Sequence, residues 1–263
     1  MSISSQISLS FFMPVYNEED NIVPAIKSAL LILEKITNNF ELILIDDGST
    51  DDTIINIQLL AEKDKRIRLI RHKFNLGYGR ALRTGIESST KEFTFYTDSD
   101  NQFDISSLPL IIMNLKPDTM IIGFRINRRD YWQRLLISRI YGWFVHFLFD
   151  IDVQDVNCSF KLFSTDLFRK YPLKSNTVFI DTEMIIKAKH AGIGIYQVPV
   201  KHHRRKTGIS KFELGKKGMM MVIHPLKVIE IIGEIIYLFP SLSGFSKTTS
   251  IDNPNGKRTA LRK

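Results

Sequence analysis

The fold is decided by residues 93–104, which read FTFYTDSDNQFD. The first half is aromatic and β-branched and predicts a buried strand. Alternate residues of an extended chain point the same way, so we expect Asp98, Asp100 and Gln102 to converge just past the end of this strand. In an open α/β sheet, ligands bind beyond the carboxyl ends of the strands. Clustered oxygen donors suit Mg²⁺ or Mn²⁺, which would neutralise a diphosphate.

Apolar runs alternate with amphipathic runs on the N-terminal side of this stretch. The pattern predicts strands at 7–13, 41–45, 67–70 and 93–97, and helices at about 20–36, ending near 63, at 77–87 and at 105–115. Such alternation is typical of an α/β fold whose central, mostly parallel sheet is flanked by helices. Right-handed crossovers place the strand-to-helix loops on one edge, so the loops at Tyr16, Asp46 and Asp98 are expected to share a rim.

The second half has a different character. After residues 120–123 we predict a long apolar helix at 131–149, irregular strand at 152–163, a helix at 182–191 and a strand at 194–200, followed by a basic loop at 201–211. A helical region is expected from about 213 to 238. The expected organisation is one domain at 1–215, an amphipathic helical segment at 216–240 and a disordered tail at 241–263.

Composition restricts the class of protein. The 263 residues carry a formal net charge of +8 and a pI near 9.4, which indicates an anionic partner. Cys158 is the only cysteine and is interpreted as a small core residue in a reducing compartment. No secretory signal and no membrane-spanning run of about 18 to 20 apolar residues is expected. A dinucleotide fingerprint and a P-loop are absent, which argues against NAD enzymes and P-loop NTPases.

Six short motifs then follow one another in order. They are PVYNEE at 14–19, DDGS at 46–49, NLG at 75–77, DSDNQ at 98–102, DVNCSFKLF at 155–163 and RKTGISK at 205–211. In this order the chain resembles family 2 glycosyltransferases of the GT-A fold. It is similar to dolichol-phosphate mannose synthases and bacterial polyprenyl-phosphate glycosyltransferases over about residues 7–215.

The resemblance implies a binding site for a UDP- or GDP-linked sugar. By it, Pro14, Tyr16 and Glu18 pack on the base and ribose, and either Asp46 or Asp47 reads the edge of the base. It also implies that a divalent metal and the diphosphate are held by Asp98, Asp100 and Gln102.

The resemblance also implies catalytic positions. Arg125 and Arg139 are expected near an acceptor phosphate, while Arg205 and Lys211 belong to a basic loop over the diphosphate. Asp100 and Asp155 are the other residues that the resemblance implies are catalytic. The implied reaction is transfer of a sugar with inversion at its anomeric carbon. A polyprenyl phosphate acceptor is already ionised and needs no base; a saccharide hydroxyl, as in cell-envelope polysaccharide synthesis, needs one, for which Asp155 and Glu183 are the candidates.

Other interpretations of these residues stay open. Asp46 and Asp47 are equally good helix caps. The basic loop could be a solvated face, but it lacks the interleaved aromatic residues of a nucleic-acid site, so no nucleic-acid partner is expected. His202 and His203 are interpreted as surface histidines. A nucleotidylyltransferase is disfavoured, because the first loop is not a glycine-rich loop that bears an arginine.

The long helix at 131–149 and the segment at 219–239 have two interpretations. They pack on the sheet, or one face lies in a membrane interface. Relatives often carry transmembrane helices after this domain, which this sequence does not show. The expected location is therefore cytoplasmic and peripheral, at the inner face of the membrane, where a separate membrane partner could supply the anchor.

Overall fold

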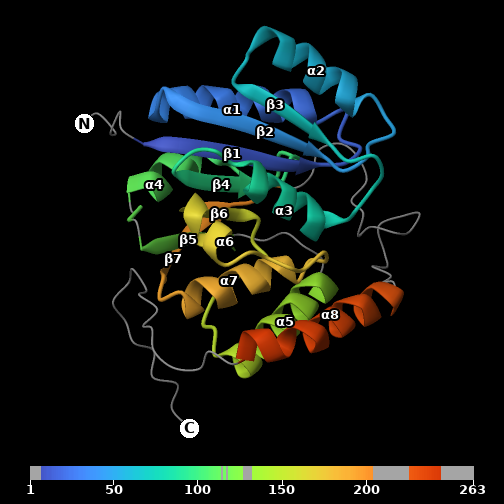
Figure 1. The fold of residues 1–263 in the computed structure, drawn as a ribbon, viewed down its shortest axis with the longest axis vertical. Helices are drawn as coiled ribbons and strands as arrows, with labels where there is room; N and C mark the ends of the chain where they lie inside the picture. The colour runs from blue at the N-terminus through green and yellow to red at the C-terminus, as the bar shows by residue number, and fades with distance from the viewer. Residues whose placement is uncertain (1–6, 114, 117, 127–131, 204–224, 244–263) are drawn as a thin grey trace.

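The computed structural model describes residues 7–113, 115–116, 118–126, 132–203 and 225–243. In this part of the chain, seven strands form one sheet: β1 (Ser8–Val15), β2 (Asn39–Asp46), β3 (Ile67–Arg71), β4 (Phe93–Thr97), β5 (Thr119–Ile126), β6 (Phe160–Ser164) and β7 (Gly194–Lys201). Their order across the sheet is β3-β2-β1-β4-β6-β5-β7 (Figure 1).

The sheet is mostly parallel, as predicted. Strands β1 to β4 run in one direction, and β5 is parallel to β7. Only β6 runs the other way among these strands, and it separates β4 from β5. The carboxyl ends of β1, β2, β4 and β5 therefore lie at one edge, together with the start of β6.

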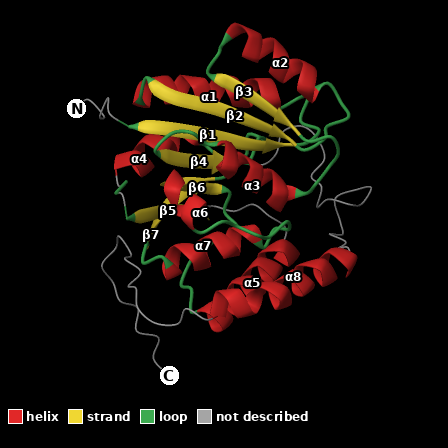
Figure 2. Cartoon of the chain, in the orientation of Figure 1, coloured by secondary structure: helices red, strands yellow, loops and turns green. Residues whose placement is uncertain are grey.

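Helices cover both faces of the sheet (Figure 2). They are α1 (Ile22–Ile36), α2 (Thr53–Lys63), α3 (Tyr78–Ser88), the 3₁₀ turn η1 (Ile105–Ser107), α4 (Leu108–Met113), α5 (Trp132–Phe149), α6 (Thr165–Lys170), α7 (Ile180–His190) and α8 (Pro225–Ser243). Side chains of α1 and α4 share one core cluster with the sheet, while α3, α6 and α7 share the other. Helices α5 and α8 lie side by side outside α7 (Figure 1).

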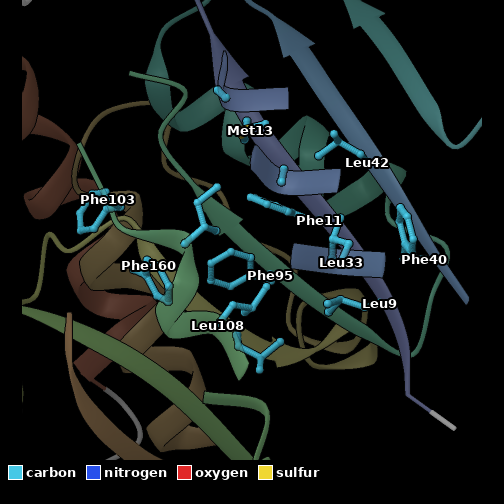
Figure 3. Packing of buried hydrophobic residues seen from close by; sticks show 14 of the residues in the cluster. Leu9, Phe11, Met13, Leu33, Phe40, Leu42, Phe95, Phe103, Leu108 and Phe160 are labelled. Atoms are coloured by element: carbon cyan, nitrogen blue, oxygen red, sulfur yellow. The ribbon is translucent and has the colours of Figure 1, made fainter. Parts of the chain in front are cut away.

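The predicted strand β4 is the centre of the core. Phe95 is fully buried, and its ring centroid lies 4.8 Å from that of Phe11 on β1 and 4.7 Å from that of Phe160 on β6 (Figure 3). Burying a side chain of this size contributes about 1.5–3 kcal/mol. The aromatic half of the motif thus stabilises the three strands that meet beneath the polar half.

Four expectations about elements need correction. The helix predicted at 105–115 is a 3₁₀ turn followed by a short α4, since the Asp104 carboxylate accepts a hydrogen bond from Ser106 N and caps the turn. Only Phe160–Ser164 of the expected 152–163 strand is a strand, and α6 was not predicted. Helix α8 is described from Pro225 to Ser243, so it extends past the expected end near 238, while the expected start near 213 stays a prediction. Residues 204–224 lie outside the described ranges.

No described helix has both the length and the apolar character that crossing a membrane requires.

Candidate active site

The loops after β1, β2 and β4 lie side by side at the carboxyl edge of the sheet, which confirms the predicted rim. Val15 is opposite Asp46 in the register of β1 and β2, and Phe12 is opposite Tyr96 in that of β1 and β4. A hydrogen bond also joins the loop after β4 to the end of β1, since Ser99 Oγ donates to Pro14 O over 2.9 Å. Residues more than 80 positions apart thus form one surface.

Asn17 ties the first two loops together. Its backbone N donates to Ser49 Oγ over 2.9 Å, and its side-chain Oδ1 accepts from Thr50 N over 2.9 Å. Its φ of +53° is in the left-handed region, which asparagine tolerates better than most residues. Pro14 and Tyr16 are partly exposed on this rim, whereas Glu18 is buried and accepts from Asn21 Nδ2 over 2.8 Å.

Asp46 and Asp47 are both buried and both organise loops. The Asp46 carboxylate accepts from Ser49 N at 3.2 Å and lies 3.7 Å from Arg71 Nε. Asp47 accepts from Leu76 N at 2.8 Å and from Gly77 N at 3.0 Å, and His72 Nδ1 lies 2.8 Å from it. Neither residue caps a helix, since the N-cap of α2 is Asp52 and that of α3 is Gly77, so the capping interpretation is wrong. Reading of a base edge by either residue stays a prediction.

Asp98, Asp100 and Gln102 follow β4 at the centre of the rim, and all three are partly buried. Asp100 Oδ1 accepts from Gln102 N over 3.0 Å, which turns the chain. Gln102 Nε2 donates to His203 O over 3.0 Å. Asp98 accepts a hydrogen bond from the Ser159 hydroxyl, so this carboxylate is oriented by the segment before β6.

The negative charge of the Asp98 and Asp100 carboxylates suits a divalent cation. The pKa of the Asp98 carboxyl is raised to about 7, first because protein atoms surround it and second because Asp100 carries a like charge nearby. Two hard carboxylate groups and an amide oxygen are a donor set suited to Mg²⁺ or Mn²⁺. Within the described ranges no three His, Cys, Asp or Glu side chains cluster to hold a metal. A cation here would therefore share these residues with phosphate oxygens of a ligand.

The Arg125 side chain is held by Asp155 rather than turned to solvent. The guanidinium makes two hydrogen bonds, from Nε to Oδ2 at 2.6 Å and from Nη2 to Oδ1 at 2.8 Å. Arg139 is exposed on α5, and its place near an acceptor phosphate stays a prediction. Glu183 is fully buried, where Lys174 N, Ser175 N and Lys187 Nζ donate to it, so its oxygens serve the fold.

The basic loop begins beside the motif after β4. His202 pairs with Phe103 as an isolated antiparallel bridge, and the two rings lie 4.9 Å apart, so His202 is packed rather than a simple surface residue. His203 N donates to Gln102 O over 2.7 Å. Arg205 and Lys211 lie outside the described residues.

Two groups at the site escaped the sequence analysis. Tyr78 OH donates to Ser159 Oγ over 3.2 Å and so extends the hydrogen bond that Ser159 makes to Asp98. The only signal for Tyr78 is its place between Gly77 and Gly79, which we interpreted as backbone freedom alone.

The second group is a buried ion pair beneath the rim. Lys161 is fully buried and donates to the Asp181 carboxylate and to Cys158 O. Tyr96 OH donates to the same carboxylate over 2.5 Å. Cys158 is buried as expected, and burial raises the pKa of its thiol.

Comparison with known proteins identifies the family that the sequence motifs predicted. The chain matches the family described as "Glycosyl transferase family 2" over residues 10–175. It is 26% identical over 221 residues to the dodecaprenyl-phosphate galacturonate synthase of Rhizobium johnstonii, covering 80% of this chain and 63% of that protein. It is also 26% identical to the dolichyl-phosphate beta-glucosyltransferase ALG5D of Trichomonas vaginalis, covering 74% of this chain and 65% of that protein. The chain thus spans less than two thirds of either relative.

Solved structures confirm the GT-A fold. Glucosyl-3-phosphoglycerate synthase from Mycobacterium tuberculosis, in complex with Mn²⁺, uridine diphosphate and phosphoglyceric acid, superposes with a TM-score of 0.62 at 16% identity. The match covers 92% of this chain and 81% of that one. Since the family match extends over more than half of the sequence and the fold agrees, this chain belongs to glycosyl transferase family 2.

Proposed function

We propose that this glycosyltransferase moves a sugar from a UDP- or GDP-linked sugar to the phosphate of a polyprenyl lipid, with inversion and with Mg²⁺ or Mn²⁺. The two curated relatives support the acceptor class, because their names give different sugars but in both cases a polyprenyl phosphate acceptor. The bound Mn²⁺ and uridine diphosphate of the structural neighbour support the metal and the nucleotide sugar.

The observation that carries the acceptor class is how the acidic side chains near the rim are bound. Asp155 is held by Arg125 through two hydrogen bonds, and Asp181 is held by Lys161. A hydroxyl acceptor needs a base positioned to take its proton. A phosphate monoester has a second pKa near 6 and is ionised at neutral pH, so it attacks without a base. Because Asp155 and Asp181 are already paired with cationic side chains, we favour a phosphate acceptor over a hydroxyl acceptor.

In this proposal the nucleotide sugar lies along the rim. Pro14 and Tyr16 are partly exposed where the base and ribose would pack, above the loops that Asp46 and Asp47 hold. Asp98, Asp100 and Gln102 would hold the metal ion, which when bound offsets charge on the leaving nucleoside diphosphate. Arg205 and Lys211, beyond the described residues, are proposed to close over the diphosphate.

In this proposal the acceptor phosphate lies toward β5 and α5. Arg125 N and Nε both donate to Asp155, so this arginine is oriented before any ligand arrives. It would bind a phosphate by turning part of its fork from Asp155 to the new anion. Arg139, exposed on α5, would contact the phosphate or lipid headgroups at the membrane surface.

An exposed apolar face on α5 and α8 supports membrane contact. We define this apolar face as Leu136, Ile140, Trp143, Phe144, Phe147, Ile229, Ile232, Ile236, Tyr237 and Phe239, all of which are exposed. Trp143 and Phe147 are 68% and 73% exposed and stack on each other at 5.8 Å. Apolar side chains this exposed on adjacent helices mark an interaction surface. We place it in the interface of the membrane that holds the lipid acceptor, at its cytoplasmic face.

A single assay tests the acceptor class. The full chain is incubated with Mn²⁺ and UDP- or GDP-sugars, and transfer to a polyprenyl phosphate is compared with transfer to the matched polyprenol and to free saccharides. We expect transfer to the phosphate alone, with a product whose anomeric configuration is opposite to that of the nucleotide sugar. Transfer only to hydroxyl acceptors would overturn the proposal and favour polysaccharide synthesis.

A further inference from the structure

One acidic residue attaches α8 to the loop before α7. Glu234 Oε2 accepts from Ser175 Oγ and from Thr177 Oγ1, each over 2.5 Å, and its Oε1 accepts from Asn176 N over 2.7 Å. Its neighbour Ile235 is buried in the core, whereas Ile236 belongs to the apolar face. Glu234 thus lies where α8 changes from the packed side to the exposed side.

The loop that Glu234 holds is in direct contact with α3. Gly79 N donates to Asn176 O over 3.1 Å, and Arg83 Nη1 donates to Asn176 Oδ1 over 3.1 Å. A Cβ at Gly79 would lie 2.4 Å from the Asn176 carbonyl carbon, so the two backbones leave no space between them. A shift of this loop would therefore displace the first turn of α3.

The first turn of α3 contacts both halves of the site. Gly77 N, immediately before the helix, donates to Asp47 Oδ2 over 3.0 Å. Tyr78 OH donates to Ser159 Oγ, and Ser159 donates to Asp98. One helical turn thus links the loop after β2 with the carboxylate after β4.

We infer that Glu234 is a positioning residue for the nucleotide-sugar site. By clamping residues 175–177 to α8, it holds the first turn of α3 and, through Tyr78 and Ser159, the orientation of Asp98. The inference rests on the proposed function, because the group it positions is the proposed diphosphate and metal site. In this role α8 supports that site. The packing of α8 against the loop before α7 and the binding of the nucleotide should therefore each affect the other.

The test is calorimetric binding of UDP and GDP with Mn²⁺ to the full chain and to Glu234→Gln, well below the midpoint of thermal unfolding. We expect about 5- to 20-fold weaker binding of the preferred nucleotide in the variant, the size of a modest coupling between sites. In turnover, KM for the nucleotide sugar should rise more than kcat falls. Should Glu234→Gln unfold, Ser175→Ala removes one of the clamping hydrogen bonds and should act in the same direction.

Glu41→Gln is the matched control. Glu41 is also a carboxylate that accepts from hydroxyls and a backbone N–H, through Ser10 and Thr90, but it lies near the start of β2, away from the rim. We expect it to lower stability and leave nucleotide affinity unchanged. If both variants weaken binding equally, the effect is general destabilisation and the inference is wrong.

A double-mutant cycle tests the route. Tyr78→Phe alone should weaken Mn²⁺-dependent nucleotide binding, and its combination with Glu234→Gln should weaken it by less than the product of the two single effects. Independent, multiplying effects would overturn the route through Tyr78. If the wild type binds neither nucleotide, the proposed function fails; if it binds and Glu234→Gln binds equally well, only the positioning role fails.

Discussion

The Arg125 guanidinium meets the Asp155 carboxylate in a two-point contact, with Nε 2.6 Å from Oδ2 and Nη2 2.8 Å from Oδ1. The side chains are only 8% and 6% exposed. Arg125 comes from the carboxyl end of β5 and Asp155 from the segment before β6, so the antiparallel strand brings them to one point. A pair this buried is costly to break from one side, because the remaining charge has no water to solvate it.

We expect Asp155→Asn to lower the free energy of unfolding by about 3 kcal/mol, as Arg125 loses its anion while the volume stays constant. Urea denaturation measures this loss. The double variant Arg125→Met with Asp155→Leu should recover most of the stability, since no charge is then left buried. A single-variant loss below about 1 kcal/mol would show that the pair behaves like a surface salt bridge.

Asp100→Ala should abolish stabilisation by nucleotide. In the wild type, UDP or GDP at about 100 times its Kd with Mn²⁺ should add about 2.7 kcal/mol to stability, seen as a raised Tm. The variant should show no such shift, because it lacks one of the two carboxylates proposed to hold the cation. Asp104→Ala is the control, since Asp104 only caps the 3₁₀ turn. Equal shifts in wild type and Asp100→Ala would remove the metal assignment.

The Glu41 carboxylate should make the free energy of unfolding depend on pH in the acidic range, at and below its ordinary pKa of 4.5. Burial acts to raise the pKa of Glu41, but hydrogen bonds from Ser10, Thr90 and Arg68 outweigh it, and the pKa lies below its ordinary 4.5. A carboxyl whose pKa is lowered by folding stabilises the protein above the unfolded pKa, and this contribution is lost as the pH falls through the folded pKa.

Glu41→Gln should therefore cost about 1–3 kcal/mol at pH 7. The difference from wild type should hold down to about pH 5 and shrink as the pH falls below 4.5, where the protonated acid resembles the amide. Denaturant titrations of both proteins across this range measure it. A difference that stays constant down to pH 2 would contradict a charged Glu41.

The apolar face should bind membranes. Replacing both Trp143 and Phe147 with serine should weaken sedimentation with phosphatidylglycerol-containing vesicles at least about tenfold, given roughly 1.5–3 kcal/mol for each large apolar side chain removed from water. The control replaces Leu31 and Leu59, which are also exposed but lie on α1 and α2. Equal losses in both double variants would leave membrane contact without support.

Gly79 should tolerate no side chain. Gly79→Ala would place a Cβ 2.4 Å from the Asn176 backbone, and overpacking of this kind typically costs about 1–3 kcal/mol. Gly142→Ala on α5 is the control, because a Cβ there meets nothing within 4 Å. It should instead raise helix stability by about 0.5–1 kcal/mol. Thermal unfolding of the two variants should therefore shift in opposite directions.

The rim itself could be predicted from local patterns. Alternation along FTFYT, the polar switch at Asp98 and the loops after residues 15 and 46 all depend on short stretches of chain. The handedness of βαβ crossovers then places those loops together without further information. Tyr16, Asp46, Asp98 and Asp100 were therefore placed correctly at one edge, although the burial of Asp46 and Asp47 was not foreseen.

The contacts that orient these residues could not be predicted in the same way. Ser159 reaches Asp98 because β6 lies antiparallel between β4 and β5. The spacing of apolar residues in the sequence does not predict that position of β6. Glu234 appears in the sequence as one charge that interrupts an apolar segment. Its three hydrogen bonds to residues 175–177 appear only once α8 is packed against α7.

By itself, the sequence determined the layered α/β fold, the edge where the proposed ligand-binding residues gather and the family. These depend on the period of apolar residues and on short motifs, which are local properties of a chain. Only the tertiary structure decided that Arg125 faces Asp155, that Lys161 faces Asp181 and that Glu234 of α8 bonds to the loop before α7. Such pairings join residues far apart in the chain, and they depend on which strands and helices become neighbours in the folded core.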